Sequence, residues 1–448
     1  MRYIQRMSPQ TAAHEEELKR LFARLREVGT DEVLLWSHGY AAADPQQTPK
    51  DPSGYIAWVA RAAELVREAG MGVGVNFGVT LGHGDGAPDS RAALGFQTMV
   101  DITGVQAKGS FCPLDQAFTA YMAEEYRKYA ACNLDTFWID DDYRLVYHAP
   151  AMFPCFCPLH IDEFNRRQGT SYDREALATA LKQDTYPEEN MVRQAWLALN
   201  AEILYSFLRL IERAVHETAP KTVIGLMLCN IDVLSAAGMT MQKTLECMSS
   251  PESPAIIRPG SLVYNDEDVY GAVDKAEQIY QMREAAPGTH SYSEIENYTY
   301  GPYQKSVAFL QRELLLYTLL SGNDGHTFNF FGETSWEERW HWFEGAGAVK
   351  AQLAALEEAT AGSTRFGVYS VVTEDYFRTT RTYGQWSIVG GPMRMGANLL
   401  ARTGISMGSV DRPPYLAIGD AVRTLDRAQV QRMLAGGAVL DAPAAADL

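Results

Sequence analysis

The sequence predicts an α/β fold in which a (β/α)8 TIM barrel is followed by a small α/β domain. Up to about residue 345, short apolar runs alternate with longer segments of helical period, which is typical of βαβ units and a parallel sheet. A chain of 448 residues has room for a barrel of roughly 250 residues or more and a second domain. We therefore expect the barrel over residues 1–362 and the small domain over residues 363–448.

Eight apolar runs have the length of strands, and eight strands are what a closed barrel needs. The expected strands are Arg2–Met7, Glu32–Trp36, Gly72–Phe77, Thr136–Asp140, Thr222–Leu228, Ser261–Tyr264, His290–Ile295 and His326–Phe330. Helical stretches separate most of them, at Glu15–Val28, Tyr55–Ala69, Gln116–Ala131, Met191–Glu217, Val273–Ala285 and Lys305–Leu320.

After a linker at Gly362, strand-like runs at Phe366–Val372, Tyr415–Ile418 and Gly436–Asp441 flank a helical run at Arg427–Leu434. This pattern indicates the small α/β domain. It stops abruptly in an alanine-rich tail, so we expect that the natural protein continues further.

Composition excludes several function classes. The net charge of −17 and the sequence pI of about 5.0 argue against nucleic acid and against an anionic membrane surface, and fit a neutral substrate. No apolar run reaches the roughly 18 residues that span a bilayer. The N-terminus lacks the apolar core of a signal peptide, and six cysteines are too few for a disulfide framework. We therefore expect a cytoplasmic protein.

The segment Thr136–Asp140 runs into three consecutive acids, Asp140, Asp141 and Asp142. On a strand, alternate residues share a face, so we expect Asp140 and Asp142 to point one way and Asp141 the other. Clustered like charges raise one another's pKa, and a carboxyl that stays protonated near neutral pH can act as a general acid. The alternatives are a solvated acidic turn and a divalent-cation site.

A second acidic strand end contains Glu294 and Glu296, which we expect to share a face, and Tyr298 follows. Glycosidases generally place two carboxyl groups on either side of the scissile bond, and aromatic rings offer sugar faces an apolar platform. Acids at the ends of two barrel strands therefore indicate a glycosidase. One of the two glutamates could instead pair with Arg or Lys and serve only structure.

The segment Cys155-Phe156-Cys157-Pro158-Leu159-His160 has a C-x-C-x2-H spacing, and Cys112 lies 43 residues upstream of Cys155. Three Cys and one His form a usual tetrahedral Zn²⁺ set. Because no coordination position would remain open, the zinc would be structural and catalysis would need no cofactor. The alternative is three thiols unrelated to a metal.

Taken together, these motifs resemble glycoside hydrolase family 42, the trimeric β-galactosidases of a retaining barrel clan. Asp140-Asp141-Asp142 occupies the position of the family's Asp-Asn-Glu, whose Glu is the acid/base, so the resemblance assigns the proton donor to Asp142. The segment Ile295-Glu296-Asn297 resembles the family's nucleophile segment, which favours Glu296 over Glu294.

The resemblance extends to the cysteines and to sugar contacts. Cys112-Pro113 with Cys155 and Cys157 matches the family's structural zinc site, and His160 replaces its last Cys. Glu338 and His341 have the spacing of the family's sugar-binding Glu and His. Lys108 stands where the family carries a substrate-site Arg, and residues 364–448 resemble the start of its trimerisation domain.

The resemblance implies a hydrolase acting on a glycoside, for example a β-galactoside, with Asp142 as acid, Glu296 or Glu294 as nucleophile, and Asp140, Asp141 and Tyr298 near the sugar. It also implies a homotrimer. The altered Asp-Asn-Glu motif leaves open a carbohydrate-binding protein without catalysis, and the aspartate triplet leaves open a divalent-metal enzyme. The sequence does not decide between retention and inversion.

Overall fold

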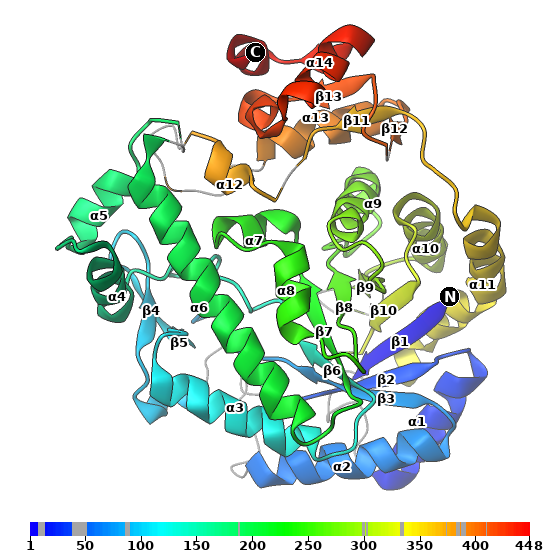
Figure 1. The fold of residues 1–448 in the computed structure, drawn as a ribbon. Helices are drawn as coiled ribbons and strands as arrows, with labels where there is room; N and C mark the ends of the chain where they lie inside the picture. Colours follow the sequence, from blue (N-terminus) through cyan, green and yellow to red (C-terminus); the bar gives the residue numbers. More distant parts are fainter. Residues whose placement is uncertain are drawn as a thin grey trace.

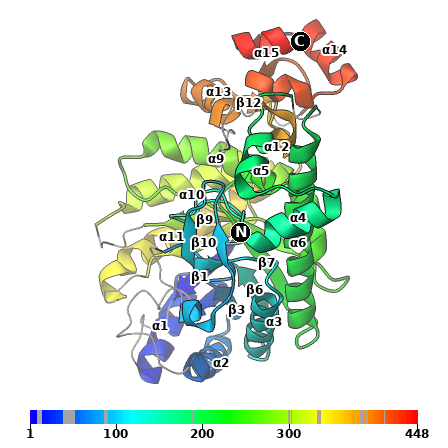
Figure 2. The same ribbon diagram turned by 90° about the vertical axis from the view of Figure 1, so that its left-hand side faces the viewer.

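The computed structural model describes residues 1–7, 14–37, 52–85, 90–186, 189–297, 301, 303–331, 336–372, 374–381, 386, 391–408 and 410–448. Eight parallel strands form one sheet in the order β8-β7-β6-β3-β2-β1-β10-β9. A parallel bridge between Ile257 and Ser291 joins the two end strands and closes the sheet. Helices surround this sheet (Figure 1, Figure 2), so the expected TIM barrel is confirmed.

The barrel strands are β1 (Arg2–Met7), β2 (Glu32–Trp36), β3 (Gly72–Phe77), β6 (Thr136–Ile139), β7 (Val223–Leu228), β8 (Ile256–Pro259), β9 (Tyr292–Glu296) and β10 (Gly325–Asn329). The helices of this part are α1 (Glu15–Glu27), α2 (Pro52–Glu68), α3 (Gln116–Ala130), α4 (Pro158–Gln168), α5 (Arg174–Leu181), α6 (Met191–His216), α7 (Ile231–Ala236), α8 (Met241–Met248), α9 (Val269–Glu284), α10 (Val307–Ser321) and α11 (Trp340–Thr360). An antiparallel hairpin, β4 (Thr98–Val100) and β5 (Gln106–Phe111), extends the loop after β3.

The sixth barrel strand was expected at Ser261–Tyr264, and that prediction is wrong, because the strand is Ile256–Pro259. Two adjacent isoleucines give this segment its strand propensity. Pro254 precedes this strand, Pro259 is its last residue and Gly260 follows it, which made the segment resemble a loop.

One buried layer of large side chains fills the barrel below its carboxyl end. It consists of one residue from each of six strands, namely Ile4, Leu34, Trp138, Met227, Ile256 and Tyr292. A Cβ on Gly225 would lie 2.4 Å from the ring of Trp138, so glycine is required beside the indole. Because side chains alternate along a strand, we expect the residues two positions further on to point the same way, and these include Arg6, Asp140, Arg258 and Glu294.

The second domain contains a four-stranded parallel sheet in the order β12-β11-β13-β14. Its strands are β11 (Val368–Ser370), β12 (Met407–Gly408), β13 (Tyr415–Ala417) and β14 (Ala438–Leu440), and its helices are α12 (Tyr376–Thr379), α13 (Gly391–Arg402), α14 (Arg427–Gly436) and α15 (Ala442–Asp447). The two-residue β12 was too short to be recognised in the sequence. The domain boundary at 362/363 stays a prediction, and it falls between the end of α11 and the start of β11.

None of the described helices combines the length and apolar character needed to cross a membrane.

Candidate active site

Charged and amide side chains gather inside the barrel where its strands end. Arg6 lies at the centre of this group, and its Nη1 is 3.4 Å from Glu296 Oε1 and 3.6 Å from Glu294 Oε1. Its Nη2 is 3.8 Å from Asp140 Oδ2, and its Nε donates to Asn76 Oδ1 at 2.8 Å. One guanidinium thus links acids from the fourth and seventh barrel strands, β6 and β9.

Glu294 is the more firmly held of the two glutamates. Arg258 Nη1 lies 2.7 Å from its Oε1, and the backbone N–H of Ser261 donates to its Oε2 at 3.2 Å. The side chain retains 5% exposure. These contacts with a cation and a backbone donor fix the position of the carboxyl group, which suits Glu294 to a structural or electrostatic role.

Glu296 has fewer partners and more access. Asn329 Nδ2 donates to its Oε1 at 2.6 Å, and its side chain is 11% exposed. Burial and the neighbouring charge of Glu294 raise the pKa of Glu296 to about 7. As expected from strand alternation, Glu294 and Glu296 both face Arg6, while Ile295 packs into the apolar core outside the strands.

The three aspartates do not follow strand alternation. Strand pairing ends at Ile139, and Asp141 and Asp142 lie in a turn. The expectation that Asp140 and Asp142 share a face is therefore wrong, because the turn sends the three carboxylates to three different sets of partners. Asp140 joins Arg6, Asn76 and Arg258 in the barrel.

Asp141 is the most accessible of the three, with 22% side-chain exposure. Its carboxylate lies 3.2 Å from Arg144 Nη1, accepts from the Cys229 thiol at 3.2 Å, and lies 3.9 Å from His83 Nδ1. Burial raises the pKa of Asp141, but the charges of Arg144, His83 and Arg258 outweigh burial and hold that pKa well below its usual range.

Asp142, the proton donor that the family pattern assigns, is fully buried. Its Oδ2 accepts the backbone N–H groups of Thr80 and Gly82 at 2.6 and 2.7 Å, and its Oδ1 has no hydrogen-bond partner. Burial raises the pKa of Asp142 to about 6. The group therefore has the proton affinity of a general acid, but its contacts are with the loop after β3.

The expected sugar-binding residues lie apart from these acids. Lys108, Glu338 and His341 are exposed, and within the described part of the chain none of them contacts the carboxylates inside the barrel. Buried Arg339, between Glu338 and His341, donates to the Phe330 carbonyl oxygen at 3.0 Å. Tyr298 lies outside the described residues.

Sequence reasoning missed five residues that hold these acids, namely Arg6, Asn76, His83, Cys229 and Arg258. The two arginines carried a usable signal. Each stands two residues after a barrel-filling isoleucine, Ile4 or Ile256, so strand alternation alone places both charges inside the barrel. A charge buried there needs an opposite charge nearby.

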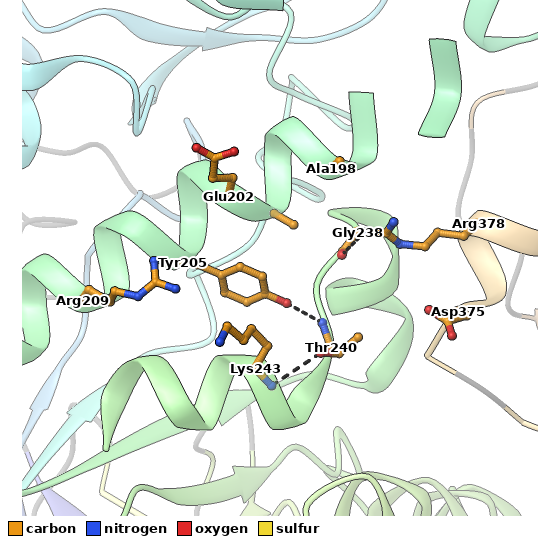
Figure 3. A pocket seen from close by; sticks show the side chains of 10 residues that line it. Ala198, Glu202, Tyr205, Arg209, Gly238, Thr240, Lys243, Asp375 and Arg378 are labelled. Atoms are coloured by element: carbon orange, nitrogen blue, oxygen red, sulfur yellow. Dashed lines mark hydrogen bonds between the residues drawn. The ribbon is translucent and has the colours of Figure 1, made fainter. Parts of the chain in front are cut away.

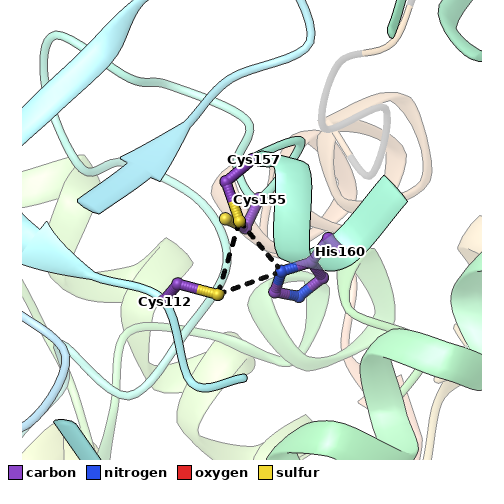
Figure 4. A group of neighbouring side chains, drawn as sticks. All are labelled: Cys112, Cys155, Cys157 and His160. Carbon is purple, nitrogen blue, oxygen red and sulfur yellow. Dashed lines mark hydrogen bonds between the residues drawn. The ribbon is translucent and has the colours of Figure 1, made fainter. Parts of the chain in front are cut away.

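The cysteine motif comes together as expected. Cys112, Cys155, Cys157 and His160 are buried, and their ligand atoms all lie within 4.8 Å of one another (Figure 4). Cys112 Sγ is 3.2 Å from His160 Nδ1 and 3.5 Å from Cys157 Sγ. Tetrahedral zinc with Zn–S of about 2.3 Å requires ligand atoms roughly 3.5–3.8 Å apart, so the donor set and its spacing suit a metal such as zinc.

A second group, His83, Asp140 and Asp141, also has ligand atoms within 4.8 Å of one another. Arg144 and Arg258 already place positive charge 3.2 and 3.8 Å from its two carboxylates. These cations compensate the acids without an ion, so the divalent-metal alternative gains no specific support.

A hollow of about 380 Å³ lies on the outside of the barrel between α6, α8 and α12, where Tyr205, Lys243 and Arg378 line it (Figure 3). Two of its cations have protein partners, since Lys243 pairs with Glu246 at 2.8 Å and Arg378 donates to the Gly238 carbonyl oxygen at 2.7 Å. None of the sequence-predicted site residues lines this hollow.

No protein-family model and no curated protein matches the sequence, but solved structures share its fold. A β-galactosidase from the haloarchaeon Halorubrum lacusprofundi superposes with a TM-score of 0.64 at 12% identity, covering 99% of this chain and 73% of that one. Gan42B, a GH42 β-galactosidase from G. stearothermophilus, gives 0.62 at 12% identity over 98% and 70%.

A GH5_18 enzyme from Streptomyces cattleya, solved with GlcNAc, gives a TM-score of 0.54 at 11% identity, with 98% of each chain covered. At these identities the likeness establishes the fold alone. The resemblance of the motifs to family 42 is thus confirmed at the level of architecture: this chain is built on the barrel fold of the GH42 β-galactosidases.

Proposed function

We propose that this protein is a glycoside hydrolase that cleaves a neutral glycoside, for example a β-galactoside, with one carboxyl group from the aspartate triplet and one from β9. The observation that carries the proposal is the link that Arg6 makes between Asp140 and the two glutamates, since it brings acids from opposite sides of the barrel to one mouth. Two carboxyl groups across a scissile bond are the usual requirement of glycosidases.

Glu296 is the proposed nucleophile. It is more exposed than Glu294, and its contacts are with Arg6 and Asn329, whereas Arg258 and Ser261 hold Glu294 in place. The surplus of acid over base in the whole chain supports a neutral substrate.

Asp141 is the proposed partner of Glu296, in preference to Asp142. Its greater exposure supports contact with the leaving oxygen, whereas Asp142 is buried against loop N–H groups. In the free protein Arg144 keeps Asp141 ionised. A bound sugar that displaces water from Asp141 favours its neutral form, because desolvation raises the pKa of a carboxyl. Lys108, Glu338, His341 and Tyr298 remain predicted sugar contacts.

The metal at the cysteine group is proposed to be structural zinc. Cys112, Cys155, Cys157 and His160 would fill all four tetrahedral positions, so the ion would fasten the end of β5 to the start of α4. Catalysis would use carboxyl groups alone. The homotrimer and the cytoplasmic location remain predictions from the sequence.

The test is turnover of aryl glycosides by Glu296→Gln, Asp141→Asn and Asp142→Asn. We expect the first two to lower kcat by two or more orders of magnitude with unchanged circular dichroism, and Asp142→Asn to keep most activity. An acid/base variant should lose less rate on substrates with good leaving groups, which need little protonation. Full activity in both Glu296→Gln and Asp141→Asn would overturn the proposal.

A carbohydrate-binding protein without catalysis is the second candidate. Ion pairing of Asp141 with Arg144 favours it, since a carboxyl group whose pKa is held low is a poor proton donor. Binding of a sugar without turnover of any aryl glycoside would favour this candidate over the hydrolase.

A further inference from the structure

A cavity of about 360 Å³ lies where the second domain meets the barrel. Its floor is lined by residues of α9 and α7 of the barrel, and its roof by residues at the carboxyl ends of β11 and β12. In Figure 1, α9 lies beneath β11 and β12. In open parallel sheets, ligands bind outside the carboxyl ends of the strands. Pockets for small molecules usually enclose about 300–1,000 Å³, so this cavity is large enough for a small sugar.

Polar contacts around this cavity join its floor in the barrel to its roof in the second domain. Arg365 of the second domain donates to Glu277 at 2.8 Å and stacks 4.2 Å over the ring of Tyr280. Arg402 pairs with Asp274 at 2.9 Å, and Glu374 accepts the backbone N–H of Met241. The cavity is therefore preformed between two fixed surfaces.

The described lining combines hydrogen-bonding groups with apolar Ile231, Ala285 and Val372, and it contains no basic residue. Gln281 and Ser370 line it, together with the carboxyl groups of Glu284 and Glu374. Gln281 Oε1 is buried and has no hydrogen-bond partner, which is costly unless a ligand or water supplies a donor. Two tyrosine rings, Tyr280 and Tyr369, also line it, together with Glu277 and Gly408.

This lining selects one chemical class of ligand. The lack of Lys and Arg among the described lining residues disfavours anions. In the described part of the chain, the residue groups that could surround one metal ion do not include the carboxyl groups of this cavity. These carboxyl groups therefore do not converge on a metal cation. Burial raises the pKa of Glu374 to about 7, which allows it to donate as well as accept. Dispersed acceptors beside aromatic rings fit a molecule with several hydroxyl groups.

We propose that the cavity between the domains binds a neutral mono- or disaccharide, as a carbohydrate site separate from the barrel mouth. The choice of ligand class rests in part on the proposed function, because a glycosidase works among such sugars. Since the site contacts α7 and α9 and both strands of the roof, its occupant would also fasten the second domain to the barrel.

Hydrogen-exchange mass spectrometry of the full chain with galactose or N-acetylglucosamine tests the proposal. We expect the sugar to protect peptides covering Val269–Glu284 and Val368–Ser370. Gln281→Leu should abolish this protection without changing kcat/KM. Gln278→Leu is the matched control, because Gln278 is on the same helix but outside the cavity lining, and it should keep the protection.

Protection confined to peptides of the barrel mouth, equal protection in Gln281→Leu, or no protection by either sugar would overturn the proposal. Aryl-glycoside turnover is measured separately. Failure of the second site with turnover intact is thus distinguishable from failure of the proposed function.

Discussion

The pH dependence of activity tests whether Glu296 and Asp141 share a single proton. Cleavage needs one protonated and one ionised carboxyl group. Asp141 is ionised down to low pH, and the pKa of Glu296 is about 7, so the pair carries one proton below about pH 7 and none above it. The rate depends on that proton whichever carboxyl donates it. We expect kcat/KM, which reports the free enzyme, to fall tenfold per pH unit above about 7.

The descending limb of this pH profile, where kcat/KM falls, should shift in Glu294→Gln by an amount that can be calculated. Glu294 and Glu296 contact the same nitrogen of Arg6, and the charge of Glu294 raises the pKa of Glu296. Two like charges about 6 Å apart repel by about 0.7 kcal/mol in water and about 3 kcal/mol at an effective dielectric constant of 20. At about 1.4 kcal/mol per pKa unit, the limb should move down by roughly 0.5–2 pH units.

The assay is hydrolysis of an aryl glycoside from pH 5 to pH 9 by the wild type, Glu294→Gln and Glu246→Gln. The last variant is the control, because it removes a carboxylate that pairs with Lys243 on the surface, and its limb should coincide with that of the wild type. A limb that stays in place or moves to higher pH in Glu294→Gln would refute the electrostatic reasoning. A wild-type rate that stays level up to pH 9 would refute the shared proton itself.

Three further predictions concern the fold and the metal. The folded pKa of Asp142, about 6, lies above its ordinary value of 3.8, so the wild type loses stability as pH rises through about 6. The side chain of Asp142→Asn does not titrate, so the Tm of this variant should change less between pH 4 and 7. The loss of unfolding free energy that Asp142 causes in the wild type should be at most about 3 kcal/mol. Elemental analysis should find about one zinc per chain, and less than half an equivalent in Cys157→Ser. A chelator that leaves this buried zinc in place should not change kcat, whereas a loss of activity would favour the divalent-metal alternative.

The barrel could be predicted because its signal is local and repeated. Strands such as β2 (Glu32–Trp36) and β3 (Gly72–Phe77) are short runs rich in apolar residues, and buried parallel strands need such runs irrespective of what surrounds them. The cysteine group could be predicted for a related reason. Cys155, Cys157 and His160 lie within six residues, and few other roles bring three such side chains together. Cys112 lies 43 residues upstream of Cys155; it completes the usual set of three Cys and one His, and the resemblance to family 42 supports the same set.

The orientation of the aspartate triplet could not be predicted, because it depends on where β6 stops pairing. Asp140 continues the alternation of Trp138, but the turn that follows is fixed by contacts from other parts of the chain. Thr80 and Gly82 supply N–H groups to Asp142, and Cys229 and Arg144 bind Asp141. Side chains alternate between the two faces of a strand only where pairing with neighbouring strands keeps the backbone extended.

The same contacts explain why the family pattern and the geometry favour different aspartates. A glutamate at position 142 would be one methylene group longer than Asp142, whose carboxyl group already meets the N–H groups of Thr80 and Gly82 in a site with 0% exposure. The shorter aspartate fits as an anchor of the loop after β3. Anchoring at 142 leaves the preceding residue, Asp141, facing His83 and Cys229 at the open end of the barrel. We therefore propose that the loss of one methylene group at position 142 shifts the proton donor to Asp141, and the variants Asp141→Asn and Asp142→Asn test this shift directly.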